Sequence, residues 1–288
     1  MQGSFAEDPG LLGRLMDLLD LVFPGLARGA DRARILGAPW EQVSTPFIAT
    51  DAGRLVSHVG LIELPLVIEG RCQIVGAIHG VATHPEHRRR GHYRRLMEEV
   101  LEHCQDRLPT QILTTEHPEY FTPFGFRVVP EHVFTVPSRR PAGPGQVRLL
   151  DLDDNDDVTL LHRLLESRTP VSSRLGVVRE HGVFCFNEGR RPLHYAPDLD
   201  VVLCFEQENE KVTLYDVVGP ELPPLDAVLD RLPGPVSSVT LAFAPDRLAP
   251  DATPVPGLFN HDGPSYLMVR GSLGEANEPF ALPRPART

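Results

Sequence analysis

The chain has 288 residues, of which 41% are hydrophobic, and a formal net charge of −11. This length predicts two domains, and the apolar fraction is sufficient for sizeable cores. The negative charge argues against nonspecific nucleic-acid binding, which needs a basic surface, and it is compatible with a cationic substrate such as an amine. No apolar run reaches the length of about 18 residues that a membrane-spanning helix needs.

The N-terminal residues and the cysteines indicate a cytoplasmic protein. The sequence MQGSFAEDPG lacks the basic region and the long apolar region of a secretory signal. The four cysteines are scattered along the chain and form no closely spaced pair that suggests zinc. We therefore expect free thiols in a reducing compartment and no metal site.

The first half of the chain alternates helical and strand patterns. Apolar residues recur at helical spacing over residues 10–37, and Pro24-Gly25 interrupts them. The pattern then predicts strands at 47–49, 55–64 with an extension at 66–68, 74–83, 111–114, 126–129 and 132–136, a helix at 93–107 and a helical turn within 116–124. This order predicts an α/β fold, with a mixed, mostly antiparallel sheet flanked by helices over residues 1–137.

A Pro/Gly-rich linker is predicted at residues 138–146, followed by a second domain at 147–272. The five aspartates of 151–157 suit the start of a helix at 158–165, and they lack the glycine and distal glutamate spacing of a calcium loop. Further strands are predicted at 182–186, 201–205, 211–217, 239–243 and 266–269, with a helix at 225–232. The tail, 273–288, contains three prolines and is expected to be disordered.

The stretch from Val81 to Met97 carries the main chemical signal. An apolar strand ends, a short loop follows, and Arg88, Arg89, Arg90 and Gly91 precede an amphipathic helix. Backbone N–H groups at a helix N-terminus lack partners, and the helix dipole favours an anion there. Glycine lets the backbone approach a phosphate, and the arginines add positive charge. These features predict a pocket for a pyrophosphate.

Residues Arg88 to Tyr93 resemble the acetyl-CoA signature of the GCN5-related N-acetyltransferases (GNAT), Arg/Gln-x-x-Gly-x-Gly/Ala. The last position departs from it, because Tyr93 replaces a small residue. A larger residue there is more similar to the enhanced-intracellular-survival type, which has tandem GNAT domains. That type usually carries a third, sterol-carrier-like domain, for which this chain is too short. The second half shows a similar element order without the arginine run, so we expect a degenerate second copy.

The resemblance implies acetyl-CoA as cosubstrate. The backbone of Val81, Ala82 and Thr83 would pair with the pantetheine arm like an added strand, and N–H groups of the following loop would face the pyrophosphate. The cofactor-binding residues expected on this basis are Val81, Ala82, Thr83, Arg88, Arg89, Arg90, Gly91, His92, Tyr93, Arg94 and Thr115. The alternative is an exposed basic helix start without a ligand.

Residues 116–126 resemble the family element Phe-Tyr-x-x-Phe-Gly-Phe, whose tyrosine serves as general acid near the thioester sulfur. Counting back from Gly125 places Phe121 at that position and Tyr120 one residue earlier. Either an insertion restores Tyr120 to the site, or phenylalanine replaces the acid, and a phenyl ring cannot donate a proton. Tyr120 is the expected acid; its alternative is a ring packed beside the sheet.

The general base has four candidates: Glu63, His79, Glu116 and His117. Glu116 is the one expected to be catalytic, whereas His79, near the middle of a strand, also suits a core histidine. The sequence thus predicts an N-acetyltransferase that transfers an acetyl group from acetyl-CoA to a primary amine of a small molecule or peptide by direct attack. The alternative is a non-catalytic acyl-CoA sensor whose second domain supports self-association.

Overall fold

Two mostly antiparallel β-sheets carry the fold, and each takes strands from both halves of the sequence. The computed structural model describes all residues except 258, 261–263 and 275–277. The first sheet has the order β1 (Ser44–Asp51), β2 (Arg54–Ile68), β3 (Arg71–Thr83), β4 (Gln111–Thr115), β15 (Pro264–Arg270) and β14 (Phe259–Asn260); β5 (Arg127–Val128) pairs with β15, and β8 (Leu175–Val177) pairs with β2. Its described pairs are antiparallel except for β3 and β4.

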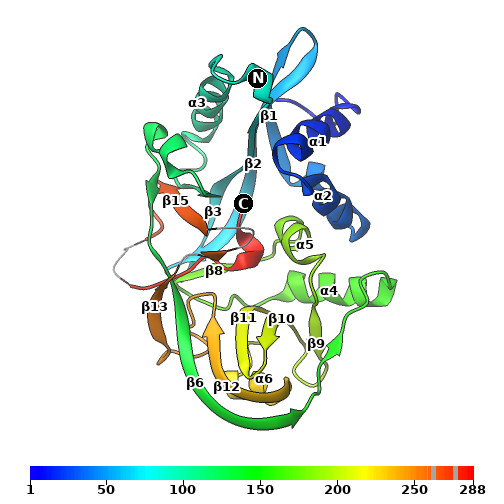
Figure 1. Ribbon diagram of the computed structural model, residues 1–288, viewed down its shortest axis with the longest axis vertical. Helices are drawn as coiled ribbons and strands as arrows, with labels where there is room; N and C mark the ends of the chain where they lie inside the picture. Colours follow the sequence, from blue (N-terminus) through cyan, green and yellow to red (C-terminus); the bar gives the residue numbers. More distant parts are fainter. Residues whose placement is uncertain (258, 261–263, 275–277) are drawn as a thin grey trace.

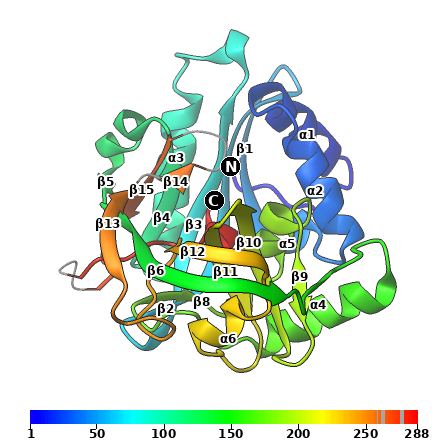
Figure 2. The same ribbon diagram turned by 60° about the horizontal axis from the view of Figure 1, so that its bottom comes forward.

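The second sheet lies below the first in Figure 1. Its order is β13 (Thr253–Gly257), β6 (Glu131–Pro144), β12 (Pro233–Leu241), β11 (Lys211–Val218), β10 (Val201–Glu208), β9 (His194–Ala196) and β7 (Arg148–Leu149). Figure 2 shows β6 running along this sheet between β13 and β12. The predicted class, a mixed and mostly antiparallel α/β fold with flanking helices, is confirmed.

Helices cover both faces of the first sheet (Figure 1). On one face, α3 (His92–Cys104) buries Leu96 and Val100 against Val59 of β2. On the other, α1 (Leu11–Val22) and α2 (Leu26–Ile35) lie side by side, and Leu15 of α1 packs with Leu55. The predicted break at Pro24-Gly25 separates these two helices. None of the described helices is long and apolar enough to cross a membrane.

The remaining helices are α4 (Asn155–Ser167), α5 (Gly182–Glu188) and α6 (Leu225–Leu229), with short 3-10 turns η1 (Trp40–Gln42), η2 (Pro85–His87), η3 (Pro118–Tyr120), η4 (Thr122–Phe124) and η5 (Arg284–Ala286). Asp154 caps α4 by accepting the N–H groups of Asp156 at 2.7 Å and Asp157 at 3.4 Å. The acidic run therefore starts a helix, as predicted.

The predicted linker is wrong for residues 138–144, which continue β6. The ladder between β6 and β12 has several register shifts, and such irregular pairing accommodates the prolines and glycines of this segment. Gly143 is needed there, because a Cβ atom on it would lie 2.9 Å from the carbonyl oxygen of Asp230. The proposed boundary between two sequential domains therefore does not describe the sheets. In particular, β15 joins the first sheet instead of the second.

The predicted strand at 182–186 is helix α5. The buried carboxylate of Glu180 accepts the N–H groups of Val183 at 2.8 Å and Phe184 at 3.0 Å and so supplies partners for the helix N-terminus. A short apolar run suits either a buried strand or a buried helix, so its periodicity could not separate them.

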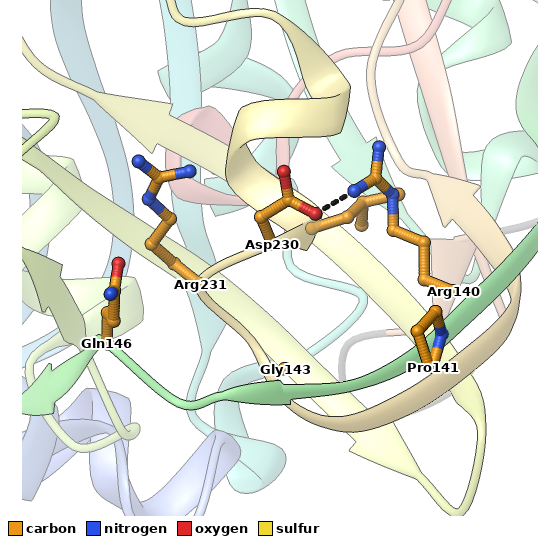
Figure 3. A pocket seen from close by; sticks show the side chains of 7 residues that line it. Arg140, Pro141, Gly143, Gln146, Asp230 and Arg231 are labelled. Carbon is orange, nitrogen blue, oxygen red and sulfur yellow. Dashed lines mark hydrogen bonds and ion pairs between the residues drawn. The ribbon is translucent and has the colours of Figure 1, made fainter.

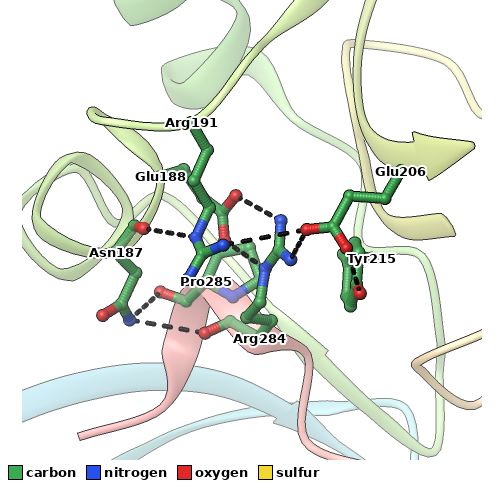
Figure 4. A network of polar contacts seen from close by, with 7 residues as sticks. All are labelled: Asn187, Glu188, Arg191, Glu206, Tyr215, Arg284 and Pro285. Atoms are coloured by element: carbon green, nitrogen blue, oxygen red, sulfur yellow. Dashed lines mark hydrogen bonds and ion pairs between the residues drawn. The ribbon is translucent and has the colours of Figure 1, made fainter. Parts of the chain in front are cut away.

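The predicted disordered tail is also wrong for residues 278–288; residues 275–277 lie outside the described part. Residues 281–287 are all buried. Arg284 forms two hydrogen bonds of 2.8 Å with Glu188 and one of 2.9 Å with Glu206, and its guanidinium lies over the ring of Tyr215 (Figure 4). Arg287 forms two hydrogen bonds of 2.9 Å with Glu131. Buried charges held in this way make the tail part of the core.

Replacing Arg287 with methionine should lower the free energy of unfolding by about 3–5 kcal/mol, because it leaves the buried carboxylate of Glu131 without its cation. The exposed pair of Arg163 and Asp200 supplies the control, since Arg163→Met should cost only about 0–1 kcal/mol. Urea unfolding measures both. An equal loss of unfolding free energy in the two variants would show that the buried pair of Arg287 and Glu131 stabilises the fold no more than the exposed pair does.

Candidate functional site

The loop between β3 and α3 has the geometry of an anion site. β3 ends at Thr83, η2 follows, and Gly91 is the N-cap of α3 in the left-handed region, with φ of 80°. No side chain caps this helix, and its first turn contains no acidic residue. The first N–H groups of a helix have no intrahelical partner, so those of α3 remain available to a ligand. A Cβ atom on Gly91 would have no atom within 4 Å, so the space beside it is open.

The arginines of the loop are exposed and partly tied to their surroundings. Arg88 donates from Nε to the carbonyl oxygen of Thr83 at 3.3 Å. Arg90 donates to Asp51 at 3.2 Å and to the carbonyl oxygen of Glu86 at 3.1 Å. Arg89 adopts φ of 62°, and Arg94 is exposed in the first turn of α3, where His92 is half-buried. The structure thus gathers the predicted loop residues around one helix start and surrounds it with positive charge.

The strands beside this loop diverge. β3 and β4 pair at Gly76–Gln111 and Ala77–Ile112, and β3 then continues for six residues to Thr83. Val81 and Thr83 are half-buried there and Ala82 is buried, whereas Thr115 ends β4. The predicted cofactor residues of β3 and β4 therefore lie on the two strand ends that lead away from the parallel pair.

Thr288 lies where β3 and β4 part, a position that sequence reasoning missed. Its backbone oxygen accepts the N–H of Thr114 at 3.0 Å and also the Thr114 hydroxyl. Its own hydroxyl donates to the carbonyl oxygen of Ile78 at 3.4 Å. The tail thus joins the two diverging strands at this point. The sequence carried no local signal for this contact, because the partners are more than 170 residues apart.

Tyr93, which departs from the family signature, links the loop to η3 and η4. Its hydroxyl donates to the carbonyl oxygen of Tyr120 at 2.8 Å. Its ring packs edge-on against Phe124 and Phe121, with centroid distances of 5.5 and 6.2 Å. Burial raises the pKa of the Tyr93 phenol. The large side chain therefore acts as a brace between the helix start and the segment that holds the expected acid.

The two candidates for the acid position differ in environment. Phe121 is 6% exposed and belongs to the core beneath α3, where it packs with Phe126. Tyr120 is 56% exposed, and its ring lies beside that of His117 at 5.1 Å. Tyr120 therefore has a solvent-accessible phenol near the loop, whereas the residue at the counted position is a core phenylalanine.

The four candidate bases are dispersed. Glu116 is exposed just after β4, and His117 pairs with Glu119 at 3.3 Å. Glu63 forms an ion pair of 2.6 Å with Arg107. His79 is 4% exposed and hydrogen-bonds through Nε2 to Ser44 at 3.0 Å; burial and the neighbouring His58 lower its pKa well below the ordinary value. Such a low pKa makes His79 a poor proton acceptor.

His58 is a buried neighbour of the site that sequence reasoning did not select. It lies on β2 with 0% exposure, and its Nδ1 is 2.7 Å from the carbonyl oxygen of Gly80. Burial lowers its pKa to about 4, although the bond to Gly80 opposes this. The imidazole is therefore neutral at physiological pH.

One group of potential metal ligands, His84, Glu86 and His87, lies in the same loop within the described residues. Arg54 approaches Nε2 of His84 at 2.8 Å, and the N–H of Glu86 approaches Nδ1 at 3.3 Å. His87 lies 3.1 Å from the carboxylate of Asp51. These contacts occupy both ring nitrogens of His84, and the adjacent arginines disfavour a cation.

The second sheet also contains a parallel pair, β11 and β12, like β3 and β4 of the first sheet. The C-terminal tail lies beside this second pair. β11 and β12 pair from Lys211–Ser238 to Leu214–Leu241, and β11 then continues to Val218. Ala281 of the tail packs with Ala242 and Tyr215 there. The turn that follows β11, Gly219-Pro220, leads to α6 without basic residues. The loop features of the first sheet therefore have no counterpart in the second; its description as a degenerate copy stays a prediction.

A groove on the second sheet is lined by Arg140, Pro141, Gly143, Gln146, Leu229, Asp230 and Arg231 (Figure 3). Arg140 pairs with Asp226 and Asp230, and Arg231 pairs with Asp198 at 2.6 Å. Its cations are thus already neutralised, and its residues come from β6 and the region of α6 instead of the loop at Gly91.

Replacing Tyr93 with phenylalanine should lower the free energy of unfolding by about 1 kcal/mol, because the hydrogen bond from its hydroxyl to the carbonyl oxygen of Tyr120 is lost. Tyr120→Phe, the same change on an exposed ring, should alter it by less than about 0.5 kcal/mol. Denaturant titration measures the free energy of unfolding of both variants. An unchanged value for Tyr93→Phe would show that the hydrogen bond from Tyr93 to Tyr120 does not stabilise the fold.

Acid should destabilise the fold through His58. Below the ordinary pKa of 6.5 the unfolded chain binds a proton that folded His58, with a pKa of about 4, does not bind. Stability should therefore fall as pH drops from 6.5 to 4, by about 3 kcal/mol from this residue, with His79 adding to the same slope. Unfolding measured across this pH range in the parent and in His58→Phe checks this. An identical slope in both proteins would contradict it.

Comparison with known proteins gives a family match for the first part of the chain. The family model for the acetyltransferase (GNAT) domain matches residues 13–129. A search of curated proteins found no matching relative.

Solved structures match almost the whole chain at low identity. A probable N-acyltransferase of unknown function from Enterococcus faecalis has 16% identity and a TM-score of 0.59, covering 96% of this chain and 73% of that one. A GCN5-related N-acetyltransferase from Anabaena variabilis has 13% identity and a TM-score of 0.57, covering 91% and 70%. Eis1 from Mycobacterium abscessus has 15% identity and a TM-score of 0.49, covering 80% and 64%.

At these identities the first two structural matches show a shared fold. The strand, loop and helix of the candidate anion site all lie within the segment that the family model matches. Residues 13–129 therefore match an acetyltransferase domain of the GNAT family, within a chain that shares the fold of N-acyltransferases.

Proposed function

We propose that the protein is an acetyl-CoA-dependent N-acetyltransferase that acts on a primary amine of a small molecule or peptide. The observation that carries the proposal is the uncapped start of α3 at Gly91, beside the free end of β3. The open space at Gly91 and the surrounding arginines suit a pyrophosphate, and the strand end at Val81–Thr83 suits an extended pantetheine arm.

In the proposed reaction the amine nitrogen attacks the thioester carbonyl, the carbon–sulfur bond breaks, and the CoA thiolate takes up a proton. Val81, Ala82 and Thr83 position the arm, while Arg88 to Arg94 and Thr115 hold the rest of the donor. Tyr120 is the proposed acid, since its phenol is exposed, and Glu116 is the proposed base. Holding both reactants in place supplies much of the rate of such a bimolecular step.

A non-catalytic acyl-CoA-binding protein is the second candidate. The observation that favours it is Phe121, which takes the counted position of the acid and is buried in the core. Release of free thiol from acetyl-CoA with a panel of amines separates the two functions. Turnover supports the enzyme, and acetyl-CoA binding without turnover on any amine supports the sensor. If Tyr120→Phe retains the parent's turnover, Tyr120 is not the acid.

Substituting Gly91 tests the donor site directly. Asparagine tolerates a left-handed backbone, so Gly91→Asn should keep the loop conformation while its side chain enters the space for the phosphate. We expect acetyl-CoA to bind at least about tenfold more weakly. Gly70→Asn is a matched control, because Gly70 also has a positive φ of 74° and open space but lies in the turn between β2 and β3.

Calorimetric titration with acetyl-CoA gives the affinities. The parent protein should also gain about 2.7 kcal/mol of stability at 100 times the dissociation constant. No stabilisation of the parent at millimolar acetyl-CoA would refute the proposed function. Equal weakening in both asparagine variants would refute the placement of the phosphates at Gly91.

A further inference from the structure

Strand β3 contains a bulge immediately before its free end. His58 of β2 pairs with Ala82, and Gly60 pairs with His79, so that one residue of β2 faces two of β3, Gly80 and Val81. Gly80 has φ of 55°, a left-handed conformation that turns its carbonyl out of the regular ladder. The bulge therefore sets the direction in which the backbone at Val81–Thr83 leaves the sheet.

The carbonyl freed by the bulge is held by His58. Because Gly80 offers only an oxygen acceptor at 2.7 Å, Nδ1 of His58 must carry the proton. The imidazole also limits what fits in the bulge, since a Cβ atom on Gly80 would lie 3.3 Å from two of its ring atoms. His58 is fully buried, so this contact is protected from water.

Ser57, the preceding residue on β2, holds the carbonyl group of Ala82, two residues beyond Gly80 on β3. Its hydroxyl donates to the carbonyl oxygen of Ala82 at 2.9 Å and lies 2.8 Å from the hydroxyl of Thr83. The two side chains thus fix the carbonyls on both sides of the peptide group that joins Val81 to Ala82. The peptide group between Val81 and Ala82 is therefore fixed on both sides. It lies in Val81–Thr83, the segment proposed to bind the pantetheine arm of the donor.

The arrangement leaves a buried polar atom of His58 unpaired, which indicates that this histidine has a role other than packing. Nε2 of His58 is buried with no hydrogen-bond partner among the described residues, and such an atom is unfavourable in a core. Leu55, Val56 and Val59, which are near it on β2, are buried apolar residues, and the ring of His79 lies 5.9 Å from that of His58. An apolar side chain at position 58 would avoid the unpaired nitrogen but would lose the donor to Gly80.

We propose that His58 and Ser57 are positioning residues that hold the bulge of β3 in the shape that binds the acyl-CoA, and so set the affinity for the donor. The inference rests on the proposed function and adds two residues outside the loop and the strand end. Neither side chain contacts the reacting atoms; both act through the backbone of β3.

The test measures acetyl-CoA binding in His58→Phe and Ser57→Ala. Phenylalanine fills the same space without a donor, and we expect about tenfold weaker binding, with a smaller loss for Ser57→Ala. His58→Asn, whose amide can reach Gly80 as Nδ1 does, should bind within about threefold of the parent. In turnover assays KM for acetyl-CoA should rise while KM for the amine stays constant, a split that general loss of structure would not produce.

Two matched changes serve as controls. His194→Phe removes a half-buried histidine from β9, and Ser172→Ala removes a buried serine hydroxyl that donates to Asp246; neither residue contacts the bulge. Both should bind acetyl-CoA as the parent does. Circular dichroism and urea unfolding confirm that each protein compared is folded.

A measurement on the parent protein needs no substitution. Nitrogen-15 chemical shifts should show His58 as the neutral tautomer with the proton on Nδ1 across the physiological range. A proton on Nε2 overturns the proposal, as does parental affinity in folded His58→Phe. If the parent itself binds no acetyl-CoA, the proposed function fails and this inference fails with it, whereas parental binding without a change in the variants refutes the positioning role alone.

Discussion

The burial of the C-terminal tail through two arginines and their three carboxylate partners is the constraint on which the rest of the structure depends. Arg284 reaches Glu188 of α5 and Glu206 of β10 (Figure 4). Arg287 reaches Glu131 of β6. A buried carboxylate needs its cation, so these pairs hold α5 and two strands of the second sheet against one segment. Asn187 strengthens the attachment by donating to three tail carbonyls, at 2.9 to 3.3 Å.

The tail couples the two sheets to the candidate site. It fills the space beside β11 with Ala281, and seven residues later Thr288 joins β3 to β4 where they diverge. The sheets exchange strands as well, because β6 enters the second sheet and β15 enters the first between β4 and β14. The sheet of the segment that matches the GNAT family model is thus completed by residues far beyond that segment, and the tail reaches its candidate site.

Local signals predicted the helix start at Gly91 and the break between α1 and α2. Gly91 before an amphipathic helix and Pro24-Gly25 between two helices act through their own backbone conformations, which are independent of distant partners. The tail and the end of β6 were mispredicted, since they depend on distant partners: Glu131 for Arg287, and β12 for β6. α5 was mispredicted because a short apolar run suits either a strand or a helix. His58 went unselected because the bulge that it holds arises only from the register between β2 and β3.

The sequence by itself determined the α/β class, the helix start with its arginines, and the absence of a phenol at the counted acid position. These are properties of residues close together in the chain, where spacing and backbone preference decide the outcome. Only the tertiary structure decided which strands share a sheet, that Tyr93 braces Tyr120, and that the tail reaches the diverging strands. Such contacts form because buried charges and backbone groups need partners, and distant segments of the chain supply them.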